Sequence, residues 1–161
     1  MNEVELTYLR RCVALAAEAL EAGDEPFGSV LVDGTGAVRA EDRNRIAGGD
    51  ATRHPEFELA RWAAGHLSEA ERREATVYTS GEHCPMCSAA HAWVGLGRIV
   101  YVASSAQLSQ WLTEWGRPQA PVRALPVEEI APHVRVEGPV DELVPDIKEL
   151  HQRLAERSSL G

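Results

Sequence analysis

Two prolines, each preceded by a side chain that can bind a metal, constrain this chain most. Pro55 follows His54, and Pro85 follows Cys84. Proline is favoured at the first position of a helix, where its missing N–H would have no acceptor. It also pushes the residue before it out of helical geometry. We therefore expect His54 and Cys84 to be the N-caps of two helices.

Cys87 completes a set of three possible metal ligands. It lies three residues after Cys84, so the two sulfurs fall on the same side of the helix start, close enough to share one tetrahedral zinc ion with the His54 imidazole. Two thiolates neutralise the dication and weaken its effect on a bound water, whereas the positive ends of two helices act in the opposite direction. We therefore expect one zinc ion that acidifies a bound water near neutral pH.

Glu56 is the candidate catalytic residue. It follows His54 by two positions, which is roughly 200° around a helix, so it should not be a fourth ligand in the same direction. Its carboxylate can instead lean over the metal-bound water, take a proton from it and pass that proton to a leaving nitrogen. This is the general acid and base work of a hydrolytic deamination.

Three other interpretations of these motifs stay open. The pair Cys84 and Cys87 alone resembles a glutaredoxin-type dithiol. His91 lies on the same helical stripe as the two cysteines, so with His54 it could close a structural Cys2His2 zinc site. In that case Glu56 would be a solvated helix residue. Finally, the motifs could have no shared role.

Charge and composition narrow the classes of partner. The 161 residues include 16 basic and 25 acidic side chains, a formal charge of −9, whereas affinity for nucleic acid comes mainly from Lys and Arg. The apolar stretches are far shorter than the ~20 residues that span a bilayer. The start of the chain lacks a basic segment followed by an apolar one. We expect a cytoplasmic protein that binds a small molecule, and neither nucleic acid nor a membrane.

Helix and strand patterns alternate along the chain and predict a single domain over residues 1–161. An initial hairpin followed by alternating helices and strands predicts an α/β fold, with a mixed sheet covered by helices in three layers. The segment 107–121, with two tryptophans and two prolines, could be a short helix over the pocket or an interface. The helices are expected over 6–20, 55–66, 85–96 and from 141 onward, and the strands over 27–32, 37–43, 75–79, 98–103 and 134–136.

Two motifs together resemble the zinc-dependent cytidine deaminase superfamily, whose signature is HxE followed later by PCxxC. They are DATRHPE at 50–56 and TSGEHCPMCSAA at 79–90. The second is similar to that of the branch with bacterial guanine deaminases and tRNA adenosine deaminases. The resemblance covers about Leu6 to Val102. It implies a three-layer α/β/α sandwich with a five-stranded sheet, one catalytic zinc per subunit, a Glu proton shuttle and a homodimer or larger assembly.

The resemblance also implies substrate contacts. Asn44 matches the family asparagine that contacts the base or ribose, although a polar turn residue is the alternative. Phe27 and Gly28 match the segment that lines the pocket floor, and Phe27 could equally be plain core. His83 stands where the family usually has proline, and Arg53 where it usually has a small residue. Either could add a hydrogen bond or a charge to the pocket, or could point to solvent.

These features predict a zinc-dependent deaminase that releases ammonia from an aminated nucleobase or close analogue, guanine ahead of cytosine or a triazine. A nucleoside or tRNA adenosine deaminase is the alternative, yet residues 141–161 carry five acidic and three basic side chains. A non-catalytic, zinc-stabilised binding protein is an alternative of another class. The resemblance to guanine-acting relatives implies that an acidic residue near the C terminus could complete the pocket of a partner subunit; the candidates are Glu137, Asp141, Glu142 and Asp146, which could equally be solvated.

Overall fold

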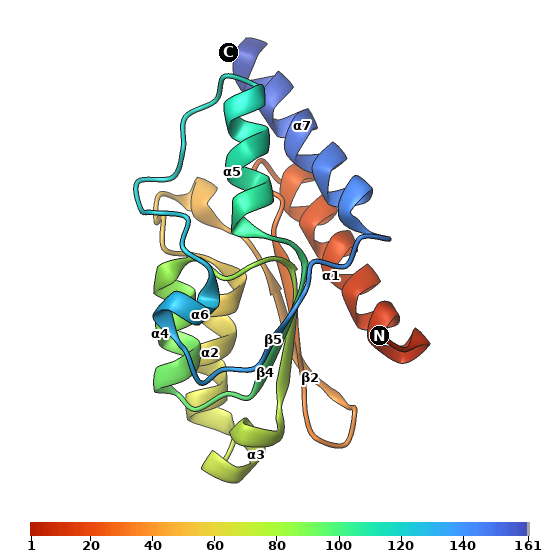
Figure 1. Ribbon diagram of the computed structural model, residues 1–161, viewed down its shortest axis with the longest axis vertical. Helices are drawn as coiled ribbons and strands as arrows, with labels where there is room; N and C mark the ends of the chain where they lie inside the picture. The colour runs from red at the N-terminus through yellow and green to blue at the C-terminus, as the bar shows by residue number, and fades with distance from the viewer. Residues whose placement is uncertain (161) are drawn as a thin grey trace.

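The computed structural model describes residues 1–160 and forms a five-stranded sheet with helices on both faces (Figure 1). The strands are β1 (Gly28–Val32), β2 (Val38–Arg43), β3 (Thr76–Gly81), β4 (Arg98–Ala103) and β5 (Val136–Glu137). The helices are α1 (Glu3–Glu21), η1 (Ile46–Gly48), α2 (Pro55–His66), α3 (Glu69–Glu74), α4 (Pro85–Trp93), α5 (Ser105–Glu114), α6 (Val127–Ile130) and α7 (Val144–Leu160).

The sheet is mixed, as expected from the sequence. Its strand order is β2-β1-β3-β4-β5. Strand β1 is antiparallel to both β2 and β3, whereas β3, β4 and β5 run parallel. The predicted α/β fold with a five-stranded mixed sheet is therefore confirmed.

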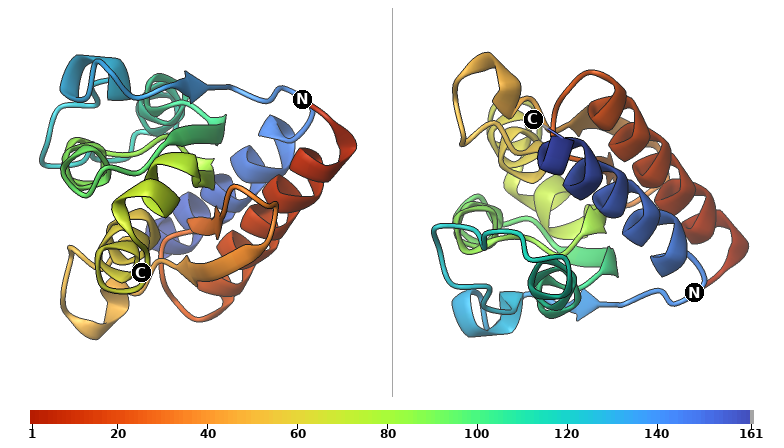
Figure 2. Two further views of the ribbon diagram at one scale, coloured as in Figure 1. Left: turned by 90° about the horizontal axis from the view of Figure 1, so that it is seen from below. Right: turned by 90° about the horizontal axis from the view of Figure 1, so that it is seen from above.

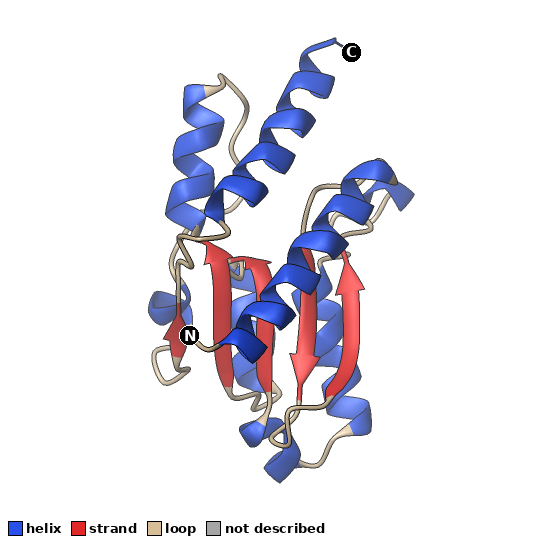
Figure 3. Cartoon of the chain, turned by 90° about the vertical axis from the view of Figure 1, so that its right-hand side faces the viewer, coloured by secondary structure: helices blue, strands red, loops and turns tan. Residues whose placement is uncertain are grey.

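Side chains alternate between the two faces of the central strands and give the sheet a core on each side. On one face, Val30 and Val100 pack with α1, α5 and α7. On the other face, Leu31 and Val77 pack with α2 and α4. The end views separate these layers, with α1 and α7 on one side of the sheet and α2 and α4 on the other (Figure 2). Helices from both ends of the chain thus cover the same face (Figure 3).

Most expected elements are present, and the differences lie at helix ends and in short segments. Helix α2 and strand β4 have the expected bounds. Helix α4 ends at Trp93, three residues early, because Gly95 has a φ of +75° that an α-helix cannot continue. In the segment 107–121, which could have been a short helix or an interface, α5 places Trp111 in the core beside α7. Three short helices, η1, α3 and α6, were not predicted.

None of the helices described in residues 1–160 combines the length and the apolar character needed to cross a membrane. A cytoplasmic location and a single domain over residues 1–161 stay predictions.

Candidate metal centre and active site

The starts of helices α2 and α4 form the centre of the site. His54 and Cys84 are the N-caps of these helices, with extended backbone angles of φ −89°, ψ 140° and φ −67°, ψ 168°, and a proline follows each. The predicted caps are therefore confirmed. Helices α2 and α4 pack side by side on one face of the sheet, so both helix starts lie at the same end of it (Figure 1).

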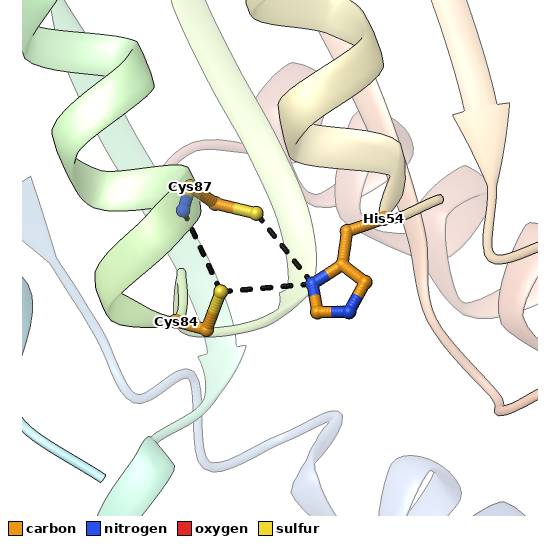
Figure 4. Close-up of side chains that lie close together, drawn as sticks. All are labelled: His54, Cys84 and Cys87. Carbon is orange, nitrogen blue, oxygen red and sulfur yellow. Dashed lines mark hydrogen bonds between the residues drawn. The ribbon is translucent and has the colours of Figure 1, made fainter. Parts of the chain in front are cut away.

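Three ligand atoms converge at these helix starts (Figure 4). The Nδ1 atom of His54 lies 3.6 Å from the Sγ of Cys84 and 3.6 Å from the Sγ of Cys87. Tetrahedral zinc, with Zn–S near 2.3 Å and Zn–N near 2.0–2.1 Å, requires an N to S separation of about 3.6 Å. The donor set and its spacing therefore fit a zinc ion held by these three residues.

Hydrogen bonds in this cluster favour negative charge on the Cys84 sulfur. A hydrogen bond from Cys87, aided by His54, lowers the pKa of the Cys84 thiol to about 4. The same interaction, together with burial, raises the pKa of Cys87. Contact with Cys84 raises the pKa of His54 to about 9. Electron-rich sulfur beside an imidazole is a suitable environment for a divalent cation.

His91 is not a fourth ligand. It does not belong to the His54, Cys84 and Cys87 group, the one such cluster within residues 1–160. Its Nε2 lies 2.7 Å from the Gly97 carbonyl oxygen, to which it can donate. The structure therefore does not support a closed Cys2His2 site, and a tetrahedral zinc ion held by His54, Cys84 and Cys87 would have its fourth position available for another ligand.

Glu56 lies beside the metal cluster without belonging to it. The side chain is buried on α2, and its Oε1 lies 3.2 Å from the Ser29 hydroxyl and 3.0 Å from the Thr79 hydroxyl. Burial is the main cause that raises the pKa of Glu56. A hydrogen bond to Glu56 also contributes to the raised pKa of Cys87. The carboxylate is thus close to the metal ligands and is oriented by two hydroxyl groups.

The expected substrate residues fall into two groups. Asn44 and Phe27 are adjacent through a backbone hydrogen bond of 3.0 Å from Asn44 N to Phe27 O. Asn44 is 1% exposed, and its Oδ1 accepts from the Ile46 N–H, so it does make the turn contact. The Phe27 ring meets His151 edge-on, with centroids 5.0 Å apart. Substrate contacts for both residues stay predictions.

Gly28, His83 and Arg53 have other neighbours. A Cβ on Gly28 would lie 2.4 Å from the Leu15 Cβ, so this glycine allows α1 to approach β1. His83 is fully buried with its ring against His91, and neither ring nitrogen has a hydrogen-bond partner among residues 1–160. It does not point to solvent. Arg53 is half-exposed and lies 3.3 Å from Glu58. Roles in substrate binding for these three residues stay predictions.

Sequence analysis missed three residues of the site. Ser29 and Thr79 hold Glu56. Ser29 is a polar residue in the otherwise apolar buried strand GSVLV, a signal that could have identified it, whereas Thr79 shares its strand with Thr76 and Ser80 and does not stand out in this way. Glu25 interacts electrostatically with His54. It lies in a loop, where no spacing rule connects it with the motif at His54.

Two of the four C-terminal acidic candidates are engaged in ion pairs within the chain. Glu137 pairs with Arg98 and Arg135, and Glu142 pairs with Arg10. That one of the four completes a partner subunit's pocket stays a prediction.

Comparison with known proteins identifies the family. Residues 2–103, which include every residue of this site, match the cytidine and deoxycytidylate deaminase zinc-binding region. The chain belongs to this deaminase family. The zinc prediction is confirmed, since the family region is zinc-binding and the three predicted ligands come together in the structure.

Three relatives of this chain are named for deamination of three different substrates. A probable cytosine deaminase of Schizosaccharomyces pombe is 34% identical over 110 residues, 67% of this chain and 65% of the relative. A guanine deaminase of Bacillus subtilis is 36% identical over 106 residues, 65% of this chain and 67% of the relative. A tRNA-specific adenosine deaminase of Haemophilus influenzae is 31% identical over 104 residues, 64% of this chain and 60% of the relative.

The chain thus spans about two thirds or less of the length of these relatives. The solved structure of the Bacillus subtilis guanine deaminase matches more widely. The match covers 90% of this chain and 91% of the chain in that structure, with 30% identity and a TM-score of 0.58.

Proposed function

We propose that this member of the deaminase family is an enzyme that hydrolyses the exocyclic C–N bond of a free aminated nucleobase or close analogue, with guanine the favoured substrate. The observation that carries the proposal is the buried Glu56 carboxylate, held by two strand hydroxyls beside three converging metal ligands. A structural zinc site requires no such carboxylate. A deaminase requires a group that moves protons between water and a leaving nitrogen.

His54, Cys84 and Cys87 would hold the zinc ion, which supplies Lewis-acid activation of a water molecule when bound. Glu56 would take a proton from that water and deliver it to the substrate nitrogen, so that ammonia leaves and a carbonyl remains. The Ser29 and Thr79 hydroxyls both lie within hydrogen-bond distance of Oε1, which leaves Oε2 to carry the proton. Because burial raises its pKa, the carboxyl is a better proton acceptor near neutral pH than an exposed one.

Asn44 and Phe27 would position the heterocycle. The backbone bond between them joins the loop before β1 to the end of β2. No described residue in 1–160 accepts a hydrogen bond from the Asn44 amide nitrogen, so this donor is free for an acceptor atom of the ring. The Phe27 ring, half-buried against His151, would offer an apolar surface to a planar base.

The experiment is ammonia release by the zinc-loaded protein across guanine, cytosine, ammeline, adenosine and cytidine. We expect release from at least one free base, with guanine fastest. The absence of ammonia release from every free base would refute the proposal. One zinc per chain with no ammonia from the whole panel would instead support a non-catalytic binding protein.

Adenosine in tRNA is the second candidate, because one of the relatives is a tRNA-specific adenosine deaminase. The formal charge of −9 opposes it, since phosphate binding depends on Lys and Arg. A gel shift with tRNA at physiological salt distinguishes the two. A stable complex that yields inosine would favour tRNA over a free base.

A further inference from the structure

Asp24 and Arg43 form an ion pair beside the residues proposed to position the heterocycle. Asp24 lies in the loop between α1 and β1, and Arg43 is the last residue of β2. The Arg43 Nη1 lies 2.8 Å from the Asp24 Oδ2, and the two side chains are only 20% and 7% exposed. Two charges so far removed from water depend on each other, because neither is well solvated alone.

The pair also holds the segment that carries Asn44. The same Arg43 Nη1 donates to the Asn44 carbonyl oxygen at 3.0 Å. The other Asp24 oxygen, Oδ1, accepts from the Ala47 N–H at 2.8 Å. Between these two points lies the turn in which the Asn44 Oδ1 accepts from the Ile46 N–H at 3.1 Å. Asp24 and Arg43 therefore fix both ends of this turn.

The polar atoms of Asn44 are engaged, apart from its amide nitrogen. The backbone N–H donates to the Phe27 carbonyl at 3.0 Å, and the carbonyl and Oδ1 accept as described. The residue is 1% exposed, and nothing in residues 1–160 accepts from its Nδ2. A buried amide donor without an acceptor is unfavourable, and an acceptor atom of a ligand would relieve this.

The same segment is also connected to the metal ligand His54. The N–H of Arg45, the residue after Asn44, donates to the Arg53 carbonyl at 3.1 Å, and Arg53 directly precedes His54. Asn44 is thus tied to the loop before β1 on one side and to the start of α2 on the other. The position of its amide relative to the metal ligands depends on how firmly this segment is held.

We propose that Asp24 and Arg43 are positioning residues for the substrate, which present the Asn44 amide to an acceptor atom of the heterocycle and so set the affinity for the base. This inference rests on the proposed function. The pair acts through Asn44 and does not need to touch the base. A donor that is fixed before the ligand arrives loses less conformational freedom on binding, which strengthens binding.

The test is equilibrium binding of 8-azaguanine and cytosine, measured by calorimetry on zinc-loaded Glu56→Gln protein so that no turnover occurs. Adding Asp24→Asn keeps the shape of the side chain and removes the charge that pairs with Arg43. We expect the affinity for the preferred base to fall by about 3- to 10-fold, the effect of one hydrogen bond. Zinc content should stay at one per chain.

Coupling to Asn44 distinguishes positioning from a merely structural role. Asn44→Ala removes the amide and should weaken binding by a similar factor. In the Asn44→Ala protein, adding Asp24→Asn should change the affinity by less than about twofold, because the amide that the pair positions is gone. With Glu56 intact, Asp24→Asn should raise KM and leave kcat unchanged, as expected for an interaction that serves binding alone.

Asp33→Asn is the matched control. Asp33 also pairs with an arginine, Arg39 at 3.2 Å, and accepts from a backbone N–H, that of Ala37 at 3.1 Å. It lies between β1 and β2, at the opposite end of this hairpin from Arg43. The control should leave both affinities as they were.

A second variant serves if Asp24→Asn does not fold. Combining Asp24→Asn with Arg43→Met removes both charges, so that no unpaired charge stays buried. This double variant should show the same fall in affinity and the same dependence on Asn44.

Three results would overturn the inference. The first is unchanged affinity in Asp24→Asn, or no binding of either base to the Glu56→Gln protein. The second is an equal loss of affinity with and without the Asn44 amide, which would show a general effect on the pocket. The third is loss of zinc, which would show that the pair supports His54 instead. If binding depends on the pair as expected but the wild-type protein releases no ammonia, the proposed function fails and this inference stands.

Discussion

At the scale of single residues, two hydroxyl groups decide the orientation of Glu56. The Ser29 and Thr79 oxygens lie 2.9 Å apart, and each also lies within hydrogen-bond distance of Glu56 Oε1. Each hydroxyl has one proton. A chain in which Ser29 donates to Thr79 and Thr79 donates to Glu56 uses both protons and leaves Oε2 free.

Thr79→Val tests this arrangement. Valine has nearly the shape of threonine but cannot donate, so Glu56 would lose its nearer hydroxyl. We expect kcat/KM for the preferred base to fall about tenfold, the effect of one hydrogen bond, with zinc content unchanged. Thr76→Val makes the same change at the far end of β3 and should leave the rate unchanged. Equal rates for Thr79→Val and the wild type would show that Thr79 does not orient Glu56.

The site residues that could be predicted from the sequence are those whose position follows from their near neighbours in the chain. The proline after each ligand marked two helix starts, and the spacing of Cys84 and Cys87 placed both sulfurs together. Glu25 could not be predicted in this way. Its electrostatic interaction with His54 depends on how the loop before β1 packs against the loop after β2, which is a tertiary contact with no sequence pattern.

At the scale of elements, the contact between α1 and β1 supports the loop that carries Glu25 and Phe27. Gly28 begins β1 directly under α1. A Cβ there would lie 2.5 Å from the Cys12 carbonyl oxygen and 2.8 Å from the Ala16 nitrogen, both backbone atoms of α1. Helix and strand would have to move apart to accept any side chain.

Gly28→Ala should therefore destabilise the fold by roughly 1–3 kcal/mol, as overpacking does, measured by urea unfolding. Gly65→Ala is the matched control. A Cβ at Gly65, near the end of α2, would contact nothing within 4 Å. There alanine should stabilise the helix by roughly 0.5–1 kcal/mol, because glycine loses more backbone entropy on folding. An unchanged stability for Gly28→Ala would contradict the close approach of α1 and β1.

Long elements were predictable because their apolar residues repeat over several turns. Short ones were not. Helix α6 has four residues, and part of what holds it is Glu82, whose two carboxylate oxygens accept from the first N–H of α5 and the first N–H of α6. The sequence near Val127 contains no sign of that distant partner.

At the scale of the whole molecule, the two ends of the chain meet over one face of the sheet. Helix α7 packs with α1 in the core on that face. It also places His151 against Phe27 and Trp111, with ring centroids 5.0 and 6.3 Å apart. The C-terminal helix thereby supports a residue of the proposed pocket. A homodimer stays a prediction of the family resemblance.

His151 also makes stability depend on pH. Burial lowers the pKa of His151 to about 4, from an ordinary value of 6.5. Between pH 6.5 and 4 the unfolded chain binds a proton that the folded chain does not. The free energy of unfolding should therefore be fully retained above pH 6.5 and should fall by up to roughly 1.4 kcal/mol per pH unit below it.

His151→Leu should reduce this slope between pH 6.5 and 4, measured by urea unfolding at several pH values. His133→Leu, at an exposed position, serves as the control and should keep the wild-type slope. An identical slope in His151→Leu would show that His151 is not held neutral in the folded protein.

The most direct test of the central claim is ammonia release by zinc-loaded Glu56→Gln protein. Glutamine keeps the size of the side chain but cannot carry the proton. The account predicts that the variant keeps one zinc per chain, because Glu56 is not a ligand, and loses at least about 100-fold in kcat, the typical contribution of general acid and base catalysis. A variant that keeps its zinc and turns over at the wild-type rate would contradict it.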